Sequence, residues 1–391
     1  MTLAVSDPLV SDRGLAADAA DDRAEPHGRH SQTGALALER EAARTARRVR
    51  LALGGLAVAL VAACVVSVGI GAVHLTPAEV MAALGGALGL DLGTVTTQQE
   101  AVLLSIRLPR VLLGGLVGAG LAVSGALMQG LFRNPLADPS LVGVSSGAAL
   151  GASGAIVLAS TAGVTALALG PALVAIAAFV GGLATTVVVY RIATRGGRTS
   201  VATMLLAGIA VNALCGAGVG VLVLFADDDQ LRDLTFWSLG SLGGATWGAL
   251  GVVAPLVGAV VLAAPFLARP LNALLLGEAE AGHLGVRTER VKRLVVGGAA
   301  LAVGAATAVA GLIGFVGLVA PHLVRLVLGP DHRALLPASA LLGALLLVGA
   351  DLLARTVLAP AEVPIGIVTA LAGAPFFLWL LLRQPAGLGT S

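Results

Sequence analysis

The sequence lacks most of what a soluble enzyme needs. Only 12% of its 391 residues are charged and 3% are aromatic, whereas about 25% of a soluble domain is charged. Its two cysteines, Cys64 and Cys215, are isolated in apolar runs, so neither a disulfide framework nor a cysteine metal site is indicated. Lys292 is the sole lysine and Arg293 follows it, so the phosphate-binding pattern GxxxxGK[ST] is excluded from this chain.

Catalytic and metal-binding motifs are also missing. The histidines are scattered, without HExxH spacing, and no serine stands in a GxSxG elbow. The formal net charge is +2, and no basic stripe interleaved with aromatic residues suggests nucleic-acid binding. We therefore expect no catalytic residue, no metal site, no directly bound cofactor and no nucleic-acid partner.

What the chain has in abundance is apolar sequence, with 57% hydrophobic residues. Sixteen of the 46 charged residues fall within the first 50 positions, which predicts a solvated, disordered tail over residues 1–50. An apolar run over 51–73 follows and is long enough to remain as the first membrane helix. The membrane domain is expected over 51–383, with a short tail over 384–391.

The apolar runs predict an all-α membrane protein. A membrane-spanning helix needs about 20 mostly apolar residues. Runs that meet or approach this length predict ten spans, at 51–73, 110–132, 141–159, 166–190, 201–225, 246–267, 294–313, 315–328, 335–358 and 364–382.

Arginines in the short connections set the predicted orientation. Cytoplasmic loops carry an excess of Lys and Arg. Every second connection contains arginine, while those between them carry acidic residues such as Glu79 and the run Asp227 to Asp229. This alternation predicts a multi-pass protein of the bacterial cytoplasmic membrane with both termini in the cytoplasm.

Two ionisable residues stand inside a predicted span. Asp351 and Arg355 are four positions apart, so one face of a helix can bring them together as a structural ion pair. Because charged groups are costly in hydrocarbon, such residues are also functional candidates. The alternative is that Asp351 is the proton or cation site of an ion-coupled secondary transporter.

A second group of cations lies at the predicted outer surface. Arg107 and Arg110 flank the start of the second span, against the usual distribution of positive charge and at the positive end of a helix dipole. An anionic surface supplied by a partner would account for both, and Arg355 would extend the patch. A simple membrane anchor is the other explanation.

Several blocks resemble one known family in unbroken order. They are RLPR, GALMQGLFRNPLADPSLVGVSSGAALG, LGEAEAGHLGVR, GFVGLVAPHLVR, GPDHR and ADLLAR…EVPIG…TALAGAPFFLWLL. From about residue 51 to 383 the chain resembles the FecCD-type permeases, the membrane subunits of ABC importers for iron-siderophores, haem and cobalamin.

The resemblance implies a type II importer permease fold and a set of partners. It implies a dimer of permease subunits around a central path, an extracytoplasmic binding protein, and a cytoplasmic ATPase pair that binds ATP and Mg. The cargo is expected to be a ferric siderophore, with haem or cobalamin as the alternatives. The permease itself is expected not to be an enzyme.

The resemblance also assigns roles to particular residues. Binding-protein docking falls to Arg107, Arg110 and Arg355. A coupling helix for the ATPase falls within the loop over about 269–293, at Gly277, Glu278, Ala281, Leu284 and Gly285. Candidates for the translocation path and its gate are Asn134, Pro135, Thr199, Ser200 and Thr203.

Overall fold

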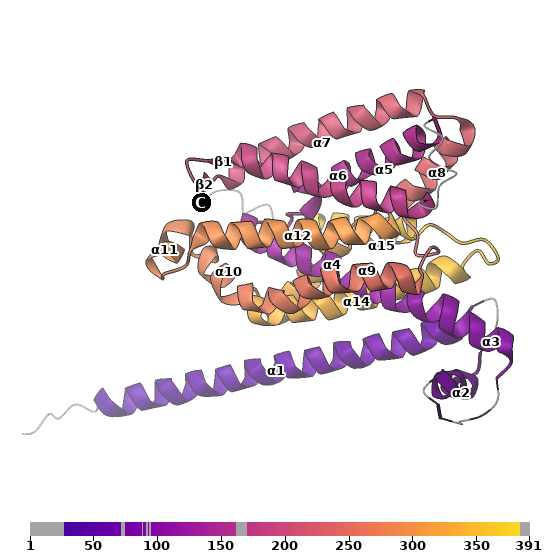
Figure 1. Ribbon diagram of the computed structural model, residues 1–391. Helices are drawn as coiled ribbons and strands as arrows, with labels where there is room; N and C mark the ends of the chain where they lie inside the picture. The colour runs from indigo at the N-terminus through magenta and orange to yellow at the C-terminus, as the bar shows by residue number, and fades with distance from the viewer. Residues whose placement is uncertain are drawn as a thin grey trace, which may run out of the picture. The chain divides into compact units, whose positions relative to one another are not determined.

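A computed structural model of the chain describes residues 27–71, 75–87, 89–90, 93, 95–161 and 170–383 (Figure 1). It divides into two units, Met1–Arg47 and Arg48–Ser391. The described part of the first unit is the beginning of helix α1, His27–Gly69. The second unit holds the rest of α1 and all the other elements, and it carries every site discussed below.

The described part of the chain is built almost entirely from helices. After α1 they are α2 (Pro77–Ala87), α3 (Thr97–Ala101), the π-helical turn η1 (Val102–Arg107), α4 (Leu108–Phe132), the 3-10 turn η2 (Pro139–Val142), α5 (Val144–Thr161), α6 (Gly170–Ala193), α7 (Val201–Leu224), α8 (Asp228–Leu239), α9 (Trp247–Ala263), the 3-10 turn η4 (Ala264–Leu267), α10 (Ala268–Leu275), α11 (Glu278–His283), α12 (Thr288–Ala310), α13 (Val316–Leu328), α14 (His332–Thr356) and α15 (Ile365–Arg383). A two-stranded hairpin, β1 (Thr194–Arg195) with β2 (Arg198–Thr199), joins α6 to α7.

Ten of these helices coincide with the ten predicted spans. Within the described residues, seven helices are long and apolar enough to cross a membrane, at 43–69, 97–132, 172–193, 201–224, 247–275, 288–310 and 332–356. Three shorter apolar helices, at 144–158, 316–328 and 365–380, complete the set. The predicted fold class, an all-α membrane protein with about ten helices, is therefore confirmed.

The beginning of the first helix differs from the prediction. Helix α1 begins at His27 rather than at Leu51, so residues 27–50, expected to be disordered, are helical. Alanine, arginine and glutamate dominate residues 35–50, and all three have high helix propensity, so the polar segment extends the apolar helix. The rest of the predicted tail, residues 1–26, and the tail over 384–391 lie outside the described residues.

Helix α4 is the centre of the second unit. It packs against α9, α12, α13 and α14, and most of its residues are buried. Glycine makes the closest approaches possible: a Cβ atom on Gly125 would overlap the carbonyl oxygen of Gly317 in α13, and one on Gly118 would overlap that of Gly343 in α14. Small residues let helices pack tightly where lipid supplies no hydrophobic drive for association.

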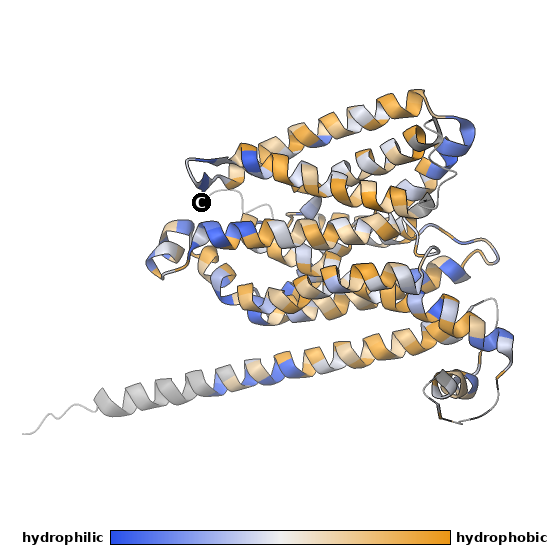
Figure 2. Cartoon of the chain, viewed as in Figure 1, coloured by the Kyte–Doolittle hydropathy of each residue, from blue (hydrophilic) through white to orange (hydrophobic). Residues whose placement is uncertain are grey.

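The connections gather at two opposite ends of the second unit. Helices α10 and α11 and the β1–β2 hairpin lie at one end, which we call the α11 end, and α8 lies at the other, the α8 end (Figure 1). The segment between α14 and α15 reaches the α8 end, where Ile365 N donates to Gly240 O at 3.1 Å. Apolar residues dominate the helices between the two ends, and hydrophilic residues collect at the connections (Figure 2).

Candidate functional site

At the α8 end, Arg110 is held by two carboxylates. It lies in the first turn of α4, and its Nε donates to Asp351 Oδ1 at 3.0 Å. Its two terminal nitrogens donate to the two oxygens of Glu362, each at 2.9 Å. This bidentate arrangement is the strongest that a guanidinium and a carboxylate can form. It joins α4 to α14 and to the segment that leads into α15.

The neighbouring arginines extend this network to the end of α1. Arg355 Nε lies 3.1 Å from Asp351 Oδ2, which is the ion pair expected from the spacing of four. Arg355 also donates to Ser67 O at 3.0 Å. Arg107 donates to Val68 O at 2.7 Å. Three arginines therefore fasten α1, α4 and α14 together.

The burial of these arginines corrects one expectation from the sequence. Arg107 is 4% and Arg110 is 7% exposed, and the side chain of Arg355 is 8% exposed, so the three do not form an open cationic patch. The physical reason is that Asp351 and Glu362 form ion pairs with Arg110 and Arg355 inside the protein, while Arg107 donates to the backbone carbonyls of Val68 and Gly69. Their role in docking a binding protein stays a prediction, and any partner would meet Glu362 first.

Glu362 is the outermost member of the network. Its side chain is 47% exposed, and the hydrogen bonds from Arg110 hold the pKa of its carboxyl below the ordinary value of a glutamate. It therefore stays ionised at neutral pH and keeps Arg110 neutralised. At this point an approaching charged group could compete for Arg110.

At the α11 end, the short helix α11 occupies the position predicted for the coupling helix, and its coupling role stays a prediction. Gly277 precedes it with φ of 125°, and Gly285 follows it with φ of 80°, backbone conformations that favour glycine. Gly285 N donates to Gly282 O, which closes the helix. The predicted face needs one correction: Leu284 is 65% exposed, but Ala281 is fully buried against the bundle and is not available to a partner.

Three of the predicted path and gate residues, Thr199, Ser200 and Thr203, lie on the β1–β2 hairpin or directly after it. Thr199 pairs with Thr194 and is 3% exposed, and its Oγ1 lies 3.2 Å from Tyr190 OH. Ser200 is the N-cap of α7, where its Oγ accepts from Thr203 N at 3.2 Å. These threonines and this serine therefore fix the turn from the hairpin into α7.

Lys292 joins the predicted gate to the predicted coupling helix. Its side chain is 1% exposed, and its Nζ lies 2.7 Å from Glu278 Oε2 and 3.0 Å from Glu289 Oε1. The same Nζ donates to Thr199 O at 2.6 Å. Glu289 Oε2 accepts from Thr199 N at 3.1 Å, so both backbone groups of Thr199 are engaged.

Asn134 and Pro135 lie apart from this cluster, after the end of α4. The helix stops at Arg133, which has a left-handed backbone, φ 50°, and Asn134 Oδ1 then accepts from Leu136 N at 2.9 Å. Both Asn134 and Pro135 are exposed. They shape the loop into η2 and belong to a different element from Thr199.

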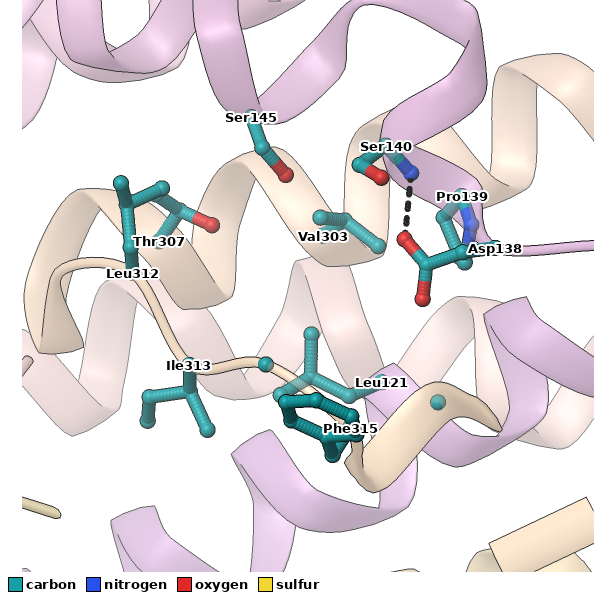
Figure 3. Close-up of a pocket in the computed structure, with 12 residues that line it drawn as sticks. Leu121, Asp138, Pro139, Ser140, Ser145, Val303, Thr307, Leu312, Ile313 and Phe315 are labelled. Atoms are coloured by element: carbon teal, nitrogen blue, oxygen red, sulfur yellow. Dashed lines mark hydrogen bonds between the residues drawn. The ribbon is translucent and has the colours of Figure 1, made fainter. Parts of the chain in front are cut away.

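A cavity of about 230 Å³ opens beside that loop (Figure 3). Its polar lining includes Asp138, which directly precedes η2, Ser145 of α5 and Thr307 of α12, and Phe315 covers one side. Asp138 caps η2, because its Oδ1 accepts from Ser140 N at 2.8 Å. Phe315 has φ of 67°, which is unusual for a bulky residue and is imposed by the sharp entry into α13.

Four residues that complete these sites were not predicted to be site residues from the sequence: Tyr190, Glu289, Lys292 and Glu362. Lys292 served there only to exclude a phosphate loop. A lone lysine at the beginning of an apolar helix, shortly after an acidic segment, is a signal that could have indicated a paired, buried cation.

The geometry defines a bundle of membrane helices with an internal ionic network at one end and the short helix α11 at the other, and the chain is similar to known proteins. The family model for the FecCD transport family matches residues 56–383. The chain is 51% identical over 304 residues to the hemin transport system permease protein HmuU of Yersinia pestis, covering 76% of this chain and 90% of that protein. It is 50% identical over 294 residues to the cobalamin import system permease protein BtuC of Halobacterium salinarum, covering 75% of this chain and 76% of that one.

A solved structure shows the same fold. It is described as an inward-facing conformation of an ABC transporter of the metal-chelate type, and it superposes with a TM-score of 0.74 at 33% identity. It covers 85% of this chain and 99% of that one. The chain belongs to the FecCD transport family, and it is a permease subunit of an ABC importer.

Proposed function

We propose that this permease imports a metal-bound tetrapyrrole, with haem as the first candidate and cobalamin as the second. The observation that carries the proposal is the 51% identity to a hemin permease over 304 residues. The 50% identity to a cobalamin permease over 294 residues is the reason for keeping the second candidate. Both cargoes are large, rigid metal chelates that one type of path can accommodate.

A ferric siderophore, which the sequence resemblance suggested, remains the alternative cargo. Haem, cobalamin and ferric siderophores differ in shape and charge but share a chelated metal and a size that demands a wide path. The path is proposed to run between two permease subunits, so cargo preference depends on residues from both. Measured uptake of haem, cobalamin and a ferric siderophore therefore decides which of them is the cargo.

The α11 end is proposed to face the cytoplasm. Arg191, Arg195 and Arg198 lie at that end, on α6 and the hairpin, while Asp227 to Asp229 lie at the start of α8. This distribution agrees with the excess of arginine in cytoplasmic loops. It supports both termini in the cytoplasm of a bacterial cell and α8 on the outside.

In this orientation the two ends serve different partners. An ATPase pair, which binds ATP and Mg, docks at α11, where the neighbouring Leu284 is exposed. A binding protein delivers the chelate at the α8 end. There the arginines support docking indirectly: Arg110 holds Glu362, while Arg107 and Arg355 fasten the end of α1. ATP binding then shifts the two subunits between outward and inward openings.

The ion-coupled alternative has less support from the geometry of Asp351. This carboxylate is 2% exposed, and two arginines, Arg110 and Arg355, contact its oxygens. A proton or cation carrier must exchange its ion with water during each cycle. A carboxylate enclosed by two guanidinium groups is better suited to fastening helices.

The test is uptake by the reconstituted transporter. The permease, its ATPase and its binding protein are placed in liposomes, and radiolabelled haem, cobalamin and a ferric siderophore are compared with ATP inside. We expect ATP-dependent accumulation of a tetrapyrrole, abolished by an ATPase variant that binds but does not hydrolyse ATP. Accumulation of the siderophore alone would overturn the cargo assignment. Uptake that needs an ion gradient and no ATP would overturn the transport class.

A further inference from the structure

The sole lysine of the chain occupies a position where its charge joins three elements. Lys292 lies in the second turn of α12, and its side chain is 1% exposed. An ammonium group has three N–H donors and accepts no hydrogen bond. All three donors find acceptors: Thr199 O at the end of the hairpin, Glu278 Oε2 at the first residue of α11, and Glu289 Oε1 on α12 itself.

The three acceptors differ in how firmly they are fixed. Glu289 stands three residues before Lys292 on the same helix, so this pair moves as one body. Glu278 belongs to the separate short helix α11 and has a side chain that is 46% exposed. Thr199 is buried and directly precedes Ser200, the N-cap of α7. The lysine thus stands between a surface helix and the beginning of a long membrane helix.

The hairpin is held through both backbone polar groups of Thr199. Thr199 O accepts from Lys292, and Thr199 N donates to Glu289. A displacement of α11 that pulls on Glu278 therefore acts on the lysine that positions the backbone of Thr199. Because the next residue, Ser200, is the N-cap of α7, the displacement passes directly to the start of that helix.

We infer that Lys292 is a positioning residue that transmits movement of α11 to the hairpin and to the start of α7. The inference rests on the proposed function, in which an ATPase docks at α11. Ion pairing for stability alone would need only one carboxylate beside the ammonium. Glu289 already neutralises Lys292, so the second ion pair, with Glu278 of α11, is not needed for charge balance. This second ion pair is what would let a movement of α11 reach Lys292.

Two substitutions separate transmission from stability. Glu278→Gln weakens the ion pair to α11 yet leaves Lys292 neutralised by Glu289, so no unpaired charge is buried. Lys292→Met removes the junction altogether and keeps an unbranched side chain of similar length. The matched controls are Glu280→Gln, which changes an exposed glutamate on the same helix, and Arg293→Met, which removes an exposed cation next to Lys292.

The first measurement is the number of chelate molecules imported per ATP hydrolysed by the full transporter in liposomes. Glu278→Gln is expected to retain ATP hydrolysis and to lower uptake per ATP by at least about 5-fold, the lower end of the roughly 5- to 150-fold range of typical coupling between sites. Lys292→Met is expected to lower it at least as far, and both controls to match the wild type. Equal ratios in Glu278→Gln and Glu280→Gln would overturn the inference.

The second measurement follows the hairpin directly and does not depend on uptake. A nitroxide is attached to Arg198→Cys in a background carrying Cys64→Ser and Cys215→Ala, with the ATPase bound. ATP is expected to change the mobility of the label in the wild type and in both controls, and to leave it unchanged in Glu278→Gln. A full response in Glu278→Gln would overturn the inference even if Lys292→Met does not fold.

These measurements also distinguish the two proposals. If the wild-type transporter takes up no chelate with ATP, the proposed function fails. If the wild type transports, and Glu278→Gln and Lys292→Met give the same uptake per ATP and the same label response as their controls, the proposed function stands and the role of Lys292 fails.

Discussion

Arg110 and Glu362 are 252 positions apart in the sequence, yet they form a two-bonded ion pair, with both nitrogen to oxygen distances at 2.9 Å. The pair joins the first turn of α4 to the segment that enters α15. Behind it, Asp351 contacts both Arg110 and Arg355. The α8 end of this bundle is therefore held by a series of alternating charges in which Glu362 is half exposed and Arg110, Asp351 and Arg355 are buried.

Substitution of the two carboxylates in this ionic network, Asp351 and Glu362, should have very different effects on the stability of the protein. Asp351→Asn leaves two buried guanidinium groups with only one carboxylate, and we expect a loss of about 3–5 kcal/mol in the free energy of unfolding. Glu362 is half exposed, so Glu362→Gln should cost about 1 kcal/mol or less. Thermal unfolding of the purified protein in detergent measures both.

A control for these substitutions lies on the same side of the molecule. Asp229→Asn changes an exposed acidic residue in the first turn of α8, and its effect should be a few tenths of a kcal/mol, about the size of a helix-dipole interaction. If Asp351→Asn were no more destabilising than Asp229→Asn, the ion pairs of Asp351 would not be what holds the helices together at the α8 end.

The lowered pKa of Glu362 gives a prediction about pH. Hydrogen bonds from Arg110 lower the pKa of this carboxyl in the folded protein below the ordinary value of about 4.3. The pair therefore contributes its full stability above pH of about 4.3, and the contribution is lost as pH falls through the lower, folded-state pKa.

The measurement is the difference in unfolding free energy between the wild type and Glu362→Gln across pH. This difference should be constant from pH 8 to about pH 5 and should shrink only in more acidic solution. Subtracting the variant removes the contribution of Glu79, whose pKa is also lowered, by its hydrogen bonds with Thr76. A difference that grew on acidification would contradict the assignment.

The apolar runs of the sequence predicted the membrane helices well, because each run is long and is bounded by charges or turn residues. The predicted span over 201–225, for example, corresponds to α7 at Val201–Leu224. The beginning of α1 was missed because helix propensity, and not hydrophobicity, extends it to His27. The short helix α8 was missed because it is amphipathic and too short to register as a span.

The sites were less predictable because their geometry depends on residues far apart in sequence. The pair of Asp351 and Arg355 followed from a spacing of four on one helix. The burial of Arg110 did not, because it depends on Glu362 from a loop that only the fold brings near. Similarly, Gly277 and Gly285 mark the ends of α11, but nothing local to α11 indicates that Glu278 binds Lys292.

Helix packing around α4 gives a prediction with an internal control. A Cβ atom on Gly125 would overlap the backbone carbonyl of Gly317, which cannot turn aside as a side chain can. Gly125→Ala should therefore force α4 and α13 apart and destabilise the fold by about 3 kcal/mol or more. Gly115→Ala, in the same helix, would meet only Val348 at 3.9 Å, an ordinary contact, and should be neutral or slightly stabilising. Yield and thermal stability after extraction compare the two variants, and equal behaviour would contradict the close packing.

The exposed apolar residues at the two ends should separate the two partners. Leu284 follows the last turn of α11 and is 65% exposed, and Phe236 on α8 is 58% exposed. If the ATPase docks at α11, Leu284→Glu buries a charge in that interface and should weaken copurification of the ATPase by about 10-fold or more, because an unpaired interfacial charge costs several kcal/mol. Phe236→Glu should leave ATPase copurification unchanged and weaken capture of the binding protein. Both residues are exposed in the isolated subunit, so neither change should alter its thermal stability. Loss of ATPase binding in Phe236→Glu, with normal binding in Leu284→Glu, would reverse the proposed orientation of the bundle.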